Sequence, residues 1–250
     1  MRSSKDKVPP HVYFVVSALF HYLGPSFAVL LFARVEVLGV AWLRIASAAL
    51  IFAVWRRPWR IARNLEPTTR KLLLAWGAVL AVMNCCFYEA IDRLPLSTVA
   101  AIEFLPVIGL AAIGARTKRN MAALGLAVPG VYLLTGVQFA TEPVGLAFAF
   151  ANAALFAMYI VLAHRVAEHD DINGIDGLAA AMLIATVVVT PIGGWQVTGA
   201  LTQPTALLAG IGVGVSSSVI PYVTDQLAMA RLSRGTYALM VSLLPETIER

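Results

Sequence analysis

Charged residues are scarce in this chain of 250 residues. Asp, Glu, Lys and Arg make up 13% of it, whereas 59% of the residues are hydrophobic, and the mean hydropathy is +0.78. A soluble domain needs a charged surface to stay in water, so this composition excludes the soluble class. Lipid is the solvent that permits such a composition, and we expect a protein embedded in the bilayer.

Cysteine and histidine are also few. The two cysteines, Cys85 and Cys86, are adjacent inside an apolar run, and their spacing fits neither a zinc site nor a disulfide framework. The chain has no Ser/His/Asp or Cys/His arrangement with a convincing context. The glycine-rich stretch 210–214 lacks the strand and the Lys-Ser/Thr pair of a nucleotide-binding loop. We therefore expect no enzyme, no cofactor and no metal.

Long apolar runs fill most of the chain. A helix that crosses the hydrocarbon needs about 20 apolar residues, and open sheet edges cannot face lipid. The sequence therefore predicts an all-α integral membrane fold, a bundle of about nine spans that follows an N-terminal tail over residues 1–11. The spans are 12–31, 37–55, 72–91, 95–114, 121–138, 143–163, 175–194, 206–229 and 235–250.

The cations indicate the orientation. The net charge is +5, but the Lys and Arg residues lie in the tail and in alternate short loops, while the opposite loops hold only Arg34 and Arg93. Lys and Arg are enriched in the cytoplasmic loops of membrane proteins. It predicts a cytoplasmic N-terminus and gives no support to nucleic acid as a partner.

One short segment occurs twice. Residues 90–100 resemble residues 228–238, and the two copies join spans three to four and eight to nine. This indicates a repeat of five helices, with a first copy over 12–138 and a second over 143–250. Since five is odd, the second copy enters from the opposite side, as in the inverted repeats of secondary transporters. Two copies need ten helices, so we expect the last helix to be missing.

Several short stretches resemble the motifs of a known family, and they occur in the same order and at the same spacing as in that family. The chain is similar to the drug/metabolite transporter superfamily with two EamA domains, and most of all to its threonine/homoserine exporter branch. Glu89, where an apolar residue is usual, is a departure. The resemblance implies ten helices and export of amino acids or similar metabolites. It rests on Leu43–Ala46, Arg57–Arg60, Met83–Tyr88, Pro95–Leu96, Ala101–Phe104, Ala157–Ile160, Pro191–Gly193 and Ile220–Tyr222.

Two ionisable residues stand at matched depth. Arg44 in span two and Glu103 in span four each lie about 10–12 Å from the outer side, at 1.5 Å per residue. Charges in lipid are costly and mark functional candidates. Arg44 would take a substrate carboxylate, and Glu103 a substrate ammonium or a coupling proton. The alternative is a structural ion pair between the two residues.

Further polar candidates lie inside the spans. Asn84, Tyr88, Tyr159 and Tyr222 would line a cavity that binds substrate, or else bond neighbouring helices. His21, in the middle of span one, is a candidate for proton coupling, or else a neutral ring bonded to another helix.

These observations together predict a multi-pass secondary transporter of a bacterial inner membrane. It would export threonine, homoserine or a related small molecule by alternating access. The alternative is a truncated membrane protein that does not transport, or a subunit that needs a tenth helix from elsewhere. The expected partners are the small-molecule substrate and the lipid bilayer, and a homodimer is left open.

Overall fold

The computed structural model describes residues 10–62, 65–114, 125–126, 129, 142–169 and 172–229. The spans predicted at 121–138 and 235–250 lie largely or wholly outside these residues. Each of the other seven predicted spans is helical, with ends within a few residues of those expected. The elements are α1 (Pro10–Leu31), α2 (Val37–Arg56), α3 (Pro58–Ala62), α4 (Pro67–Arg93), α5 (Leu96–Gly114), α7 (Pro143–Ala167), α8 (Gly174–Gly193), η2 (Gly194–Val197), α9 (Thr198–Leu201), α10 (Pro204–Gly214), η3 (Val215–Val219) and α11 (Ile220–Met229).

Local sequence explains where several helices begin and end. Proline occupies the start of α4, α7 and α10, where its missing N–H costs no helical hydrogen bond. Asn173 caps α8, because its side chain accepts a hydrogen bond from the N–H of Ile175 at 2.9 Å. Helix α2 ends at Arg56, and the left-handed backbone of Arg57 (φ 50°, ψ 55°) turns the chain into α3.

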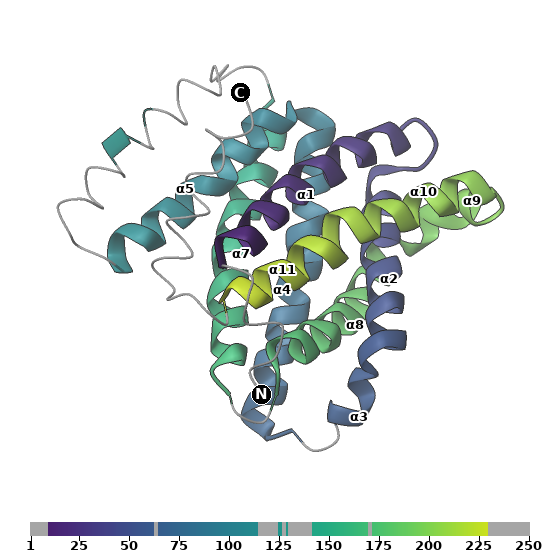
Figure 1. The fold of residues 1–250 in the computed structure, drawn as a ribbon. Helices are drawn as coiled ribbons and strands as arrows, with labels where there is room; N and C mark the ends of the chain where they lie inside the picture. The colour runs from purple at the N-terminus through teal and green to yellow at the C-terminus, as the bar shows by residue number, and fades with distance from the viewer. Residues whose placement is uncertain are drawn as a thin grey trace.

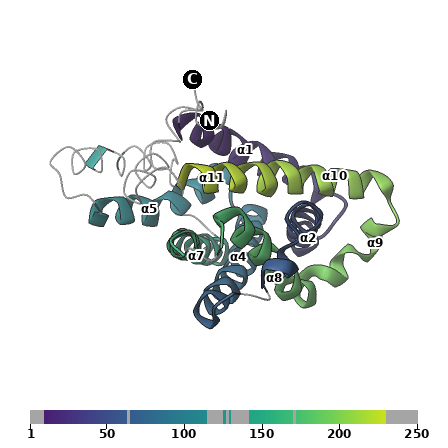
Figure 2. The same cartoon turned by 60° about the horizontal axis from the view of Figure 1, so that its bottom comes forward.

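The helices pack in two linked groups. Helix α4 lies along α7 and α8, while the continuous run α10–η3–α11 lies along α1 and α2, and α2 also contacts α8. Figure 1 shows α1 and α10–α11 side by side across one face. Figure 2, turned by 60°, shows them as a layer over α2, α4, α7 and α8.

Close helix contacts depend on small residues. A Cβ added to Gly24 of α1 would lie 2.7 Å from the Cα of Ser217 in η3, and one added to Gly214 of α10 would lie 2.9 Å from the carbonyl oxygen of Arg44 in α2. Glycine therefore allows these backbones to approach each other, as small residues do in membrane helix pairs. Both contacts bring η3 against α1 and α2, where the site described below lies.

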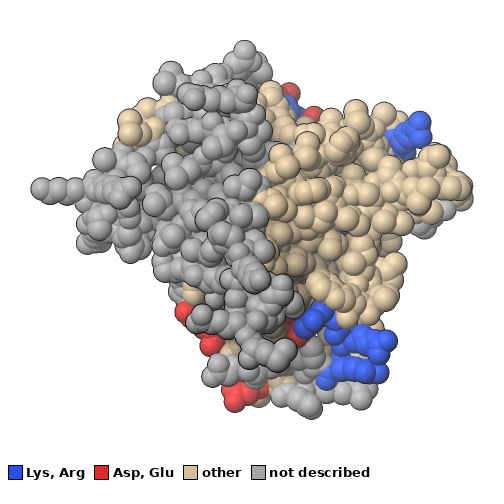
Figure 3. Space-filling model, viewed as in Figure 1, with Lys and Arg blue, Asp and Glu red and all other residues tan. Residues whose placement is uncertain are grey.

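The surface of the bundle is apolar. Leu30, Val54, Val187 and Leu208 expose 71%, 71%, 73% and 69% of their area. Five helical stretches of the described chain are long and apolar enough to cross a membrane: Val37–Arg56, Pro67–Arg93, Pro143–Ala167, Gly174–Ala200 and Pro204–Asp225. Figure 3 shows the described Lys, Arg, Asp and Glu residues toward the upper and lower ends of one face, with a broad tan area of other residues between them. The chain is a polytopic helical membrane protein.

Candidate functional site

Arg44 is the buried cation at the centre of the bundle, with only 4% of its area exposed. Its Nε donates a hydrogen bond to the hydroxyl of Ser218 at 2.8 Å, and its Nη2 donates to the backbone carbonyl of Ser217 at 2.6 Å. A longer contact of 3.4 Å joins Nη2 to the hydroxyl of Tyr222. The guanidinium of α2 is therefore fixed to the η3–α11 region from the far part of the chain.

Two aromatic rings flank the guanidinium. Its central carbon lies 5.8 Å from the ring centre of Tyr88 on α4 and 6.0 Å from that of Tyr222 on α11. A desolvated cation over an aromatic face gains about 2 kcal/mol. Tyr88 and Tyr222 therefore partly offset the cost of burying Arg44.

The contact with Ser217 depends on an unusual helical turn. Residues Val215–Val219 form a π-helix, in which the N–H of Ile220 donates to the carbonyl of Val215, five residues earlier. Such turns change the direction of backbone carbonyls and occur frequently at functional sites. Here the turn coincides with the segment whose carbonyl accepts from Arg44.

A narrow pocket lies beside Arg44, with a volume of about 20 Å³, which has room for one or two water molecules. Helices α1, α2, α4, α5, α7 and α11 all contribute to its wall. The lining residues are Pro25, Arg44, Met83, Asn84, Phe87, Leu96, Ala100, Glu103, Asn152 and Tyr222. The pocket therefore lies between the early and the late helices of the chain.

Glu103 and Arg44, which the sequence predicts at matched depth, both line this pocket. The ion pairs formed among the described residues do not include one between them. The direct Arg44–Glu103 ion pair that the sequence left open as an alternative is thus not formed in this structure.

Asn152 of α7 is a polar residue of the pocket that sequence reasoning missed. It is fully buried, lies beside the Glu103 carboxyl, and neither its amide nitrogen nor its amide oxygen makes a well-formed hydrogen bond within the described chain. The available signal was an asparagine in the middle of an otherwise apolar span.

The other polar residues predicted to bind substrate or protons differ in their position relative to the pocket. Asn84 and Tyr222 line the pocket, and Asn84 also donates to the carbonyl of Leu80 at 2.8 Å. Tyr88 lies against Arg44. Tyr159 does not line the pocket, because its ring packs 5.5 Å from that of Tyr222, on the side of α7 and α8. The side chain of His21 lies outside the described residues.

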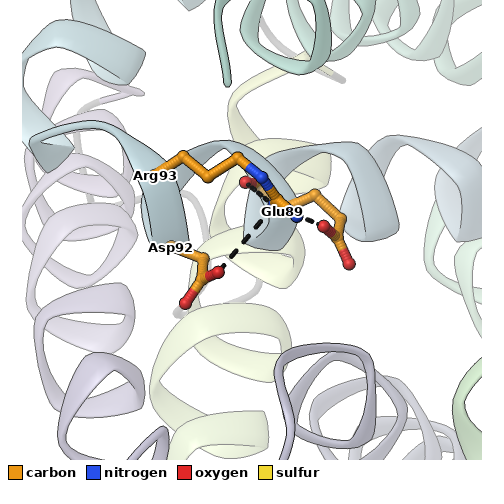
Figure 4. A network of polar contacts seen from close by, with 3 residues as sticks. All are labelled: Glu89, Asp92 and Arg93. Carbon is orange, nitrogen blue, oxygen red and sulfur yellow. Dashed lines mark hydrogen bonds and ion pairs between the residues drawn. The ribbon is translucent and has the colours of Figure 1, made fainter. Parts of the chain in front are cut away.

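The carboxylates near the ends of α4 and α11 lie outside the pocket and have partners of their own. Glu89 accepts a hydrogen bond from Arg93 at 2.5 Å, Asp92 lies 3.8 Å from the same guanidinium (Figure 4), and the Phe148 ring of α7 lies beside it. Glu89, the departure from the family pattern, thus pairs along α4. Asp225 is buried and accepts a hydrogen bond from Ser17 of α1.

The chain is similar to curated exporters. It is 31% identical to the threonine/homoserine exporter RhtA of Salmonella typhimurium strain SL1344, over 98% of this chain and 83% of that protein. It is 32% identical to the threonine/homoserine exporter RhtA of Escherichia coli strain K12, with the same coverage. No family model matches the chain.

Proposed function

Because the chain belongs to the family of the RhtA threonine/homoserine exporters, we propose that it is a secondary transporter that exports threonine, homoserine or a related small metabolite. The proposed location is a bacterial inner membrane, with the N-terminus in the cytoplasm as the distribution of Lys and Arg indicates. The proposed substrate site is the pocket between Arg44 and Glu103.

The single observation that carries the proposal is the state of the Arg44 guanidinium. An arginine has five N–H donors, and Arg44 uses Nε and Nη2 in the bonds that the structure records, all to neutral oxygens. Its charge has no direct anionic partner within the described chain. A substrate carboxylate is an anion that fits a guanidinium in a bidentate manner.

The opposite side of the pocket suits the other end of an amino acid. The carboxyl of Glu103 and the amide oxygen of Asn152 are both acceptors that can bind an ammonium group. Glu103 is also our proposed carrier of a coupling proton. A zwitterion held between Arg44 and Glu103 would compensate both charges at once.

Alternating access is proposed from the way the helices pair. Helix α4, the third span, lies along the sixth and seventh spans, α7 and α8. The run α10–α11, the eighth span, lies along the first and second, α1 and α2. This matched pairing supports two five-helix repeats, and rocking between such repeats around a central site is the usual transport movement.

The narrowness of the pocket supports this movement. A volume of about 20 Å³ is too small for an amino acid, so substrate entry requires the two halves to separate. The residues that line the pocket come from both halves. Rocking of one half on the other would therefore widen it.

The test is efflux from bacterial cells that lack their own threonine export. Cells that express this chain are preloaded with labelled threonine or homoserine, and the release of label is followed. We expect faster release than from cells that express an equal amount of Arg44→Gln in the membrane. Equal release from both, at equal expression, would contradict the proposal.

A further inference from the structure

A second concave surface is lined by residues of α3, α4 and α8 and of the segment before α4; Figure 1 shows α3 and the start of α4 at one end of the bundle. It is an open groove of about 590 Å³, which is the size of a small-molecule site. Its lining residues are Trp59, Leu65, Arg70, Leu73, Leu74, Ala180 and Ile184. It does not share a residue with the pocket at Arg44.

The groove is apolar inside. Leu65 and Leu73 form a buried floor, with 5% and 3% of their area exposed, while Leu74 and Trp59 remain 57% and 50% exposed. Six of the seven lining residues carry hydrocarbon or indole side chains. Such a surface suits a hydrocarbon chain, which dispersion contacts would hold.

Several cations are close in the sequence to residues that line this groove. Arg70 lines it, and Arg57, Arg60 and Lys71, its neighbours along α3 and α4, are exposed. Arg56 is half-buried and already paired with Asp176 at 2.6 Å. Among the described residues of 57–71, the four cations Arg57, Arg60, Arg70 and Lys71 outnumber the one acid, Glu66, so this end of the bundle carries a net positive charge.

The backbone creates this arrangement. The left-handed turn at Arg57 ends α2, and α3 then packs against α8. As a result, Trp59 lies at the edge of the apolar region with cations on both sides in the sequence. Tryptophan and arginine favour the level of the lipid headgroups.

We propose that this groove binds one anionic phospholipid. One acyl chain lies along Leu73, Leu74 and Ile184, and the phosphate lies toward Arg57 and Arg60. An apolar groove joined to a cationic rim matches the two parts of such a lipid, and basic pockets between membrane helices are known to hold anionic headgroups. This binding is independent of substrate transport.

Native mass spectrometry of the detergent-purified protein tests the proposal. Phosphatidylglycerol and phosphatidylcholine with identical acyl chains are titrated in parallel, and retained lipid is counted. We expect one phosphatidylglycerol at low concentration and weaker phosphatidylcholine. Each cation near a lipid surface contributes about 1 kcal/mol, or about a five-fold change in affinity. The double variant Arg57→Gln/Arg60→Gln should therefore bind phosphatidylglycerol about 25-fold more weakly.

Matched controls separate this groove from the general lipid belt. Arg34→Gln removes an exposed cation in the α1–α2 loop, and Leu208→Asn changes an exposed residue of α10; both should bind like the parent chain. Leu74→Asn, in the groove wall, should weaken retention. Equal retention of the two lipids, or equal losses in the groove variants and their controls, would overturn the proposal.

Discussion

The guanidinium of Arg44 is bound by the backbone carbonyl of Ser217 at 2.6 Å, across a gap of 173 positions in the chain. The carbonyl belongs to a π-helical turn, and Gly24 of α1 lies directly against the same serine. The position of the proposed substrate-binding charge therefore depends on a close contact among three helices.

The contact between α1 and η3 should be sensitive to a single methyl group. In Gly24→Ala the new Cβ would lie 2.0 Å from the Oγ and 2.7 Å from the Cα of Ser217. A backbone atom must then move, and overpacking of this kind costs about 1–3 kcal/mol. We expect a lower thermal unfolding temperature in detergent and slower transport.

Gly212→Ala is the matched control for that substitution. Gly212 lies in α10 and an added Cβ would meet nothing within 4 Å. Alanine is favoured over glycine in a helix by about 1 kcal/mol, so the unfolding temperature should stay the same or rise. Equal losses in the two variants would show that the Gly24 contact has no special importance.

Replacing Asn152 tests whether its amide binds substrate or only contributes to the fold. In Asn152→Leu, a buried amide that lies beside the Glu103 carboxyl is removed, so we expect a change in stability of about 1 kcal/mol or less. If the amide binds substrate, the half-saturating concentration of threonine should rise about ten-fold, equal to about 1.4 kcal/mol. A stable variant with unchanged transport would exclude Asn152 from the site.

Replacing Glu103 tests whether its carboxyl carries the coupling proton or only binds the substrate. Glu103→Gln keeps the size and an acceptor oxygen but cannot release a proton at neutral pH. We expect proton-driven export of threonine to be lost, while exchange of labelled for unlabelled threonine across proteoliposomes is retained in part. If the variant still exports against a gradient when a pH difference is applied, Glu103 does not carry the coupling proton.

The sequence predicted where along a helix a residue lies better than it predicted which side of the helix that residue is on. The ends of α2 agree with the predicted 37–55, and Arg44 and Glu103, predicted at equal depth, both line the pocket. Several spans are apolar on all sides, so the pattern does not tell which side faces the core. Tyr159, which we expected to line a cavity, packs its ring 5.5 Å from that of Tyr222 and is not among the residues that line the pocket at Arg44.

The π-helical turn could not be derived from the sequence. The serine run Ser216–Ser218 was visible within span eight, but its backbone geometry depends on packing against α1 and α2. The contact of Arg44 with the Ser217 carbonyl follows from that geometry. Asn152, in contrast, had a signal in the sequence, since polar residues in apolar spans are rare and frequently functional.

Counterflow of labelled threonine into proteoliposomes, measured for the parent chain, Arg44→Lys and Arg34→Lys, tests the central claim most directly. Lysine keeps the charge but lacks the planar fork that holds Ser217 and Ser218 and would bind a carboxylate. The account predicts a loss of at least about ten-fold for Arg44→Lys, equal to about 1.4 kcal/mol, and none for exposed Arg34→Lys. Equal counterflow by all three folded proteins would contradict the assignment of Arg44 as the substrate-binding cation.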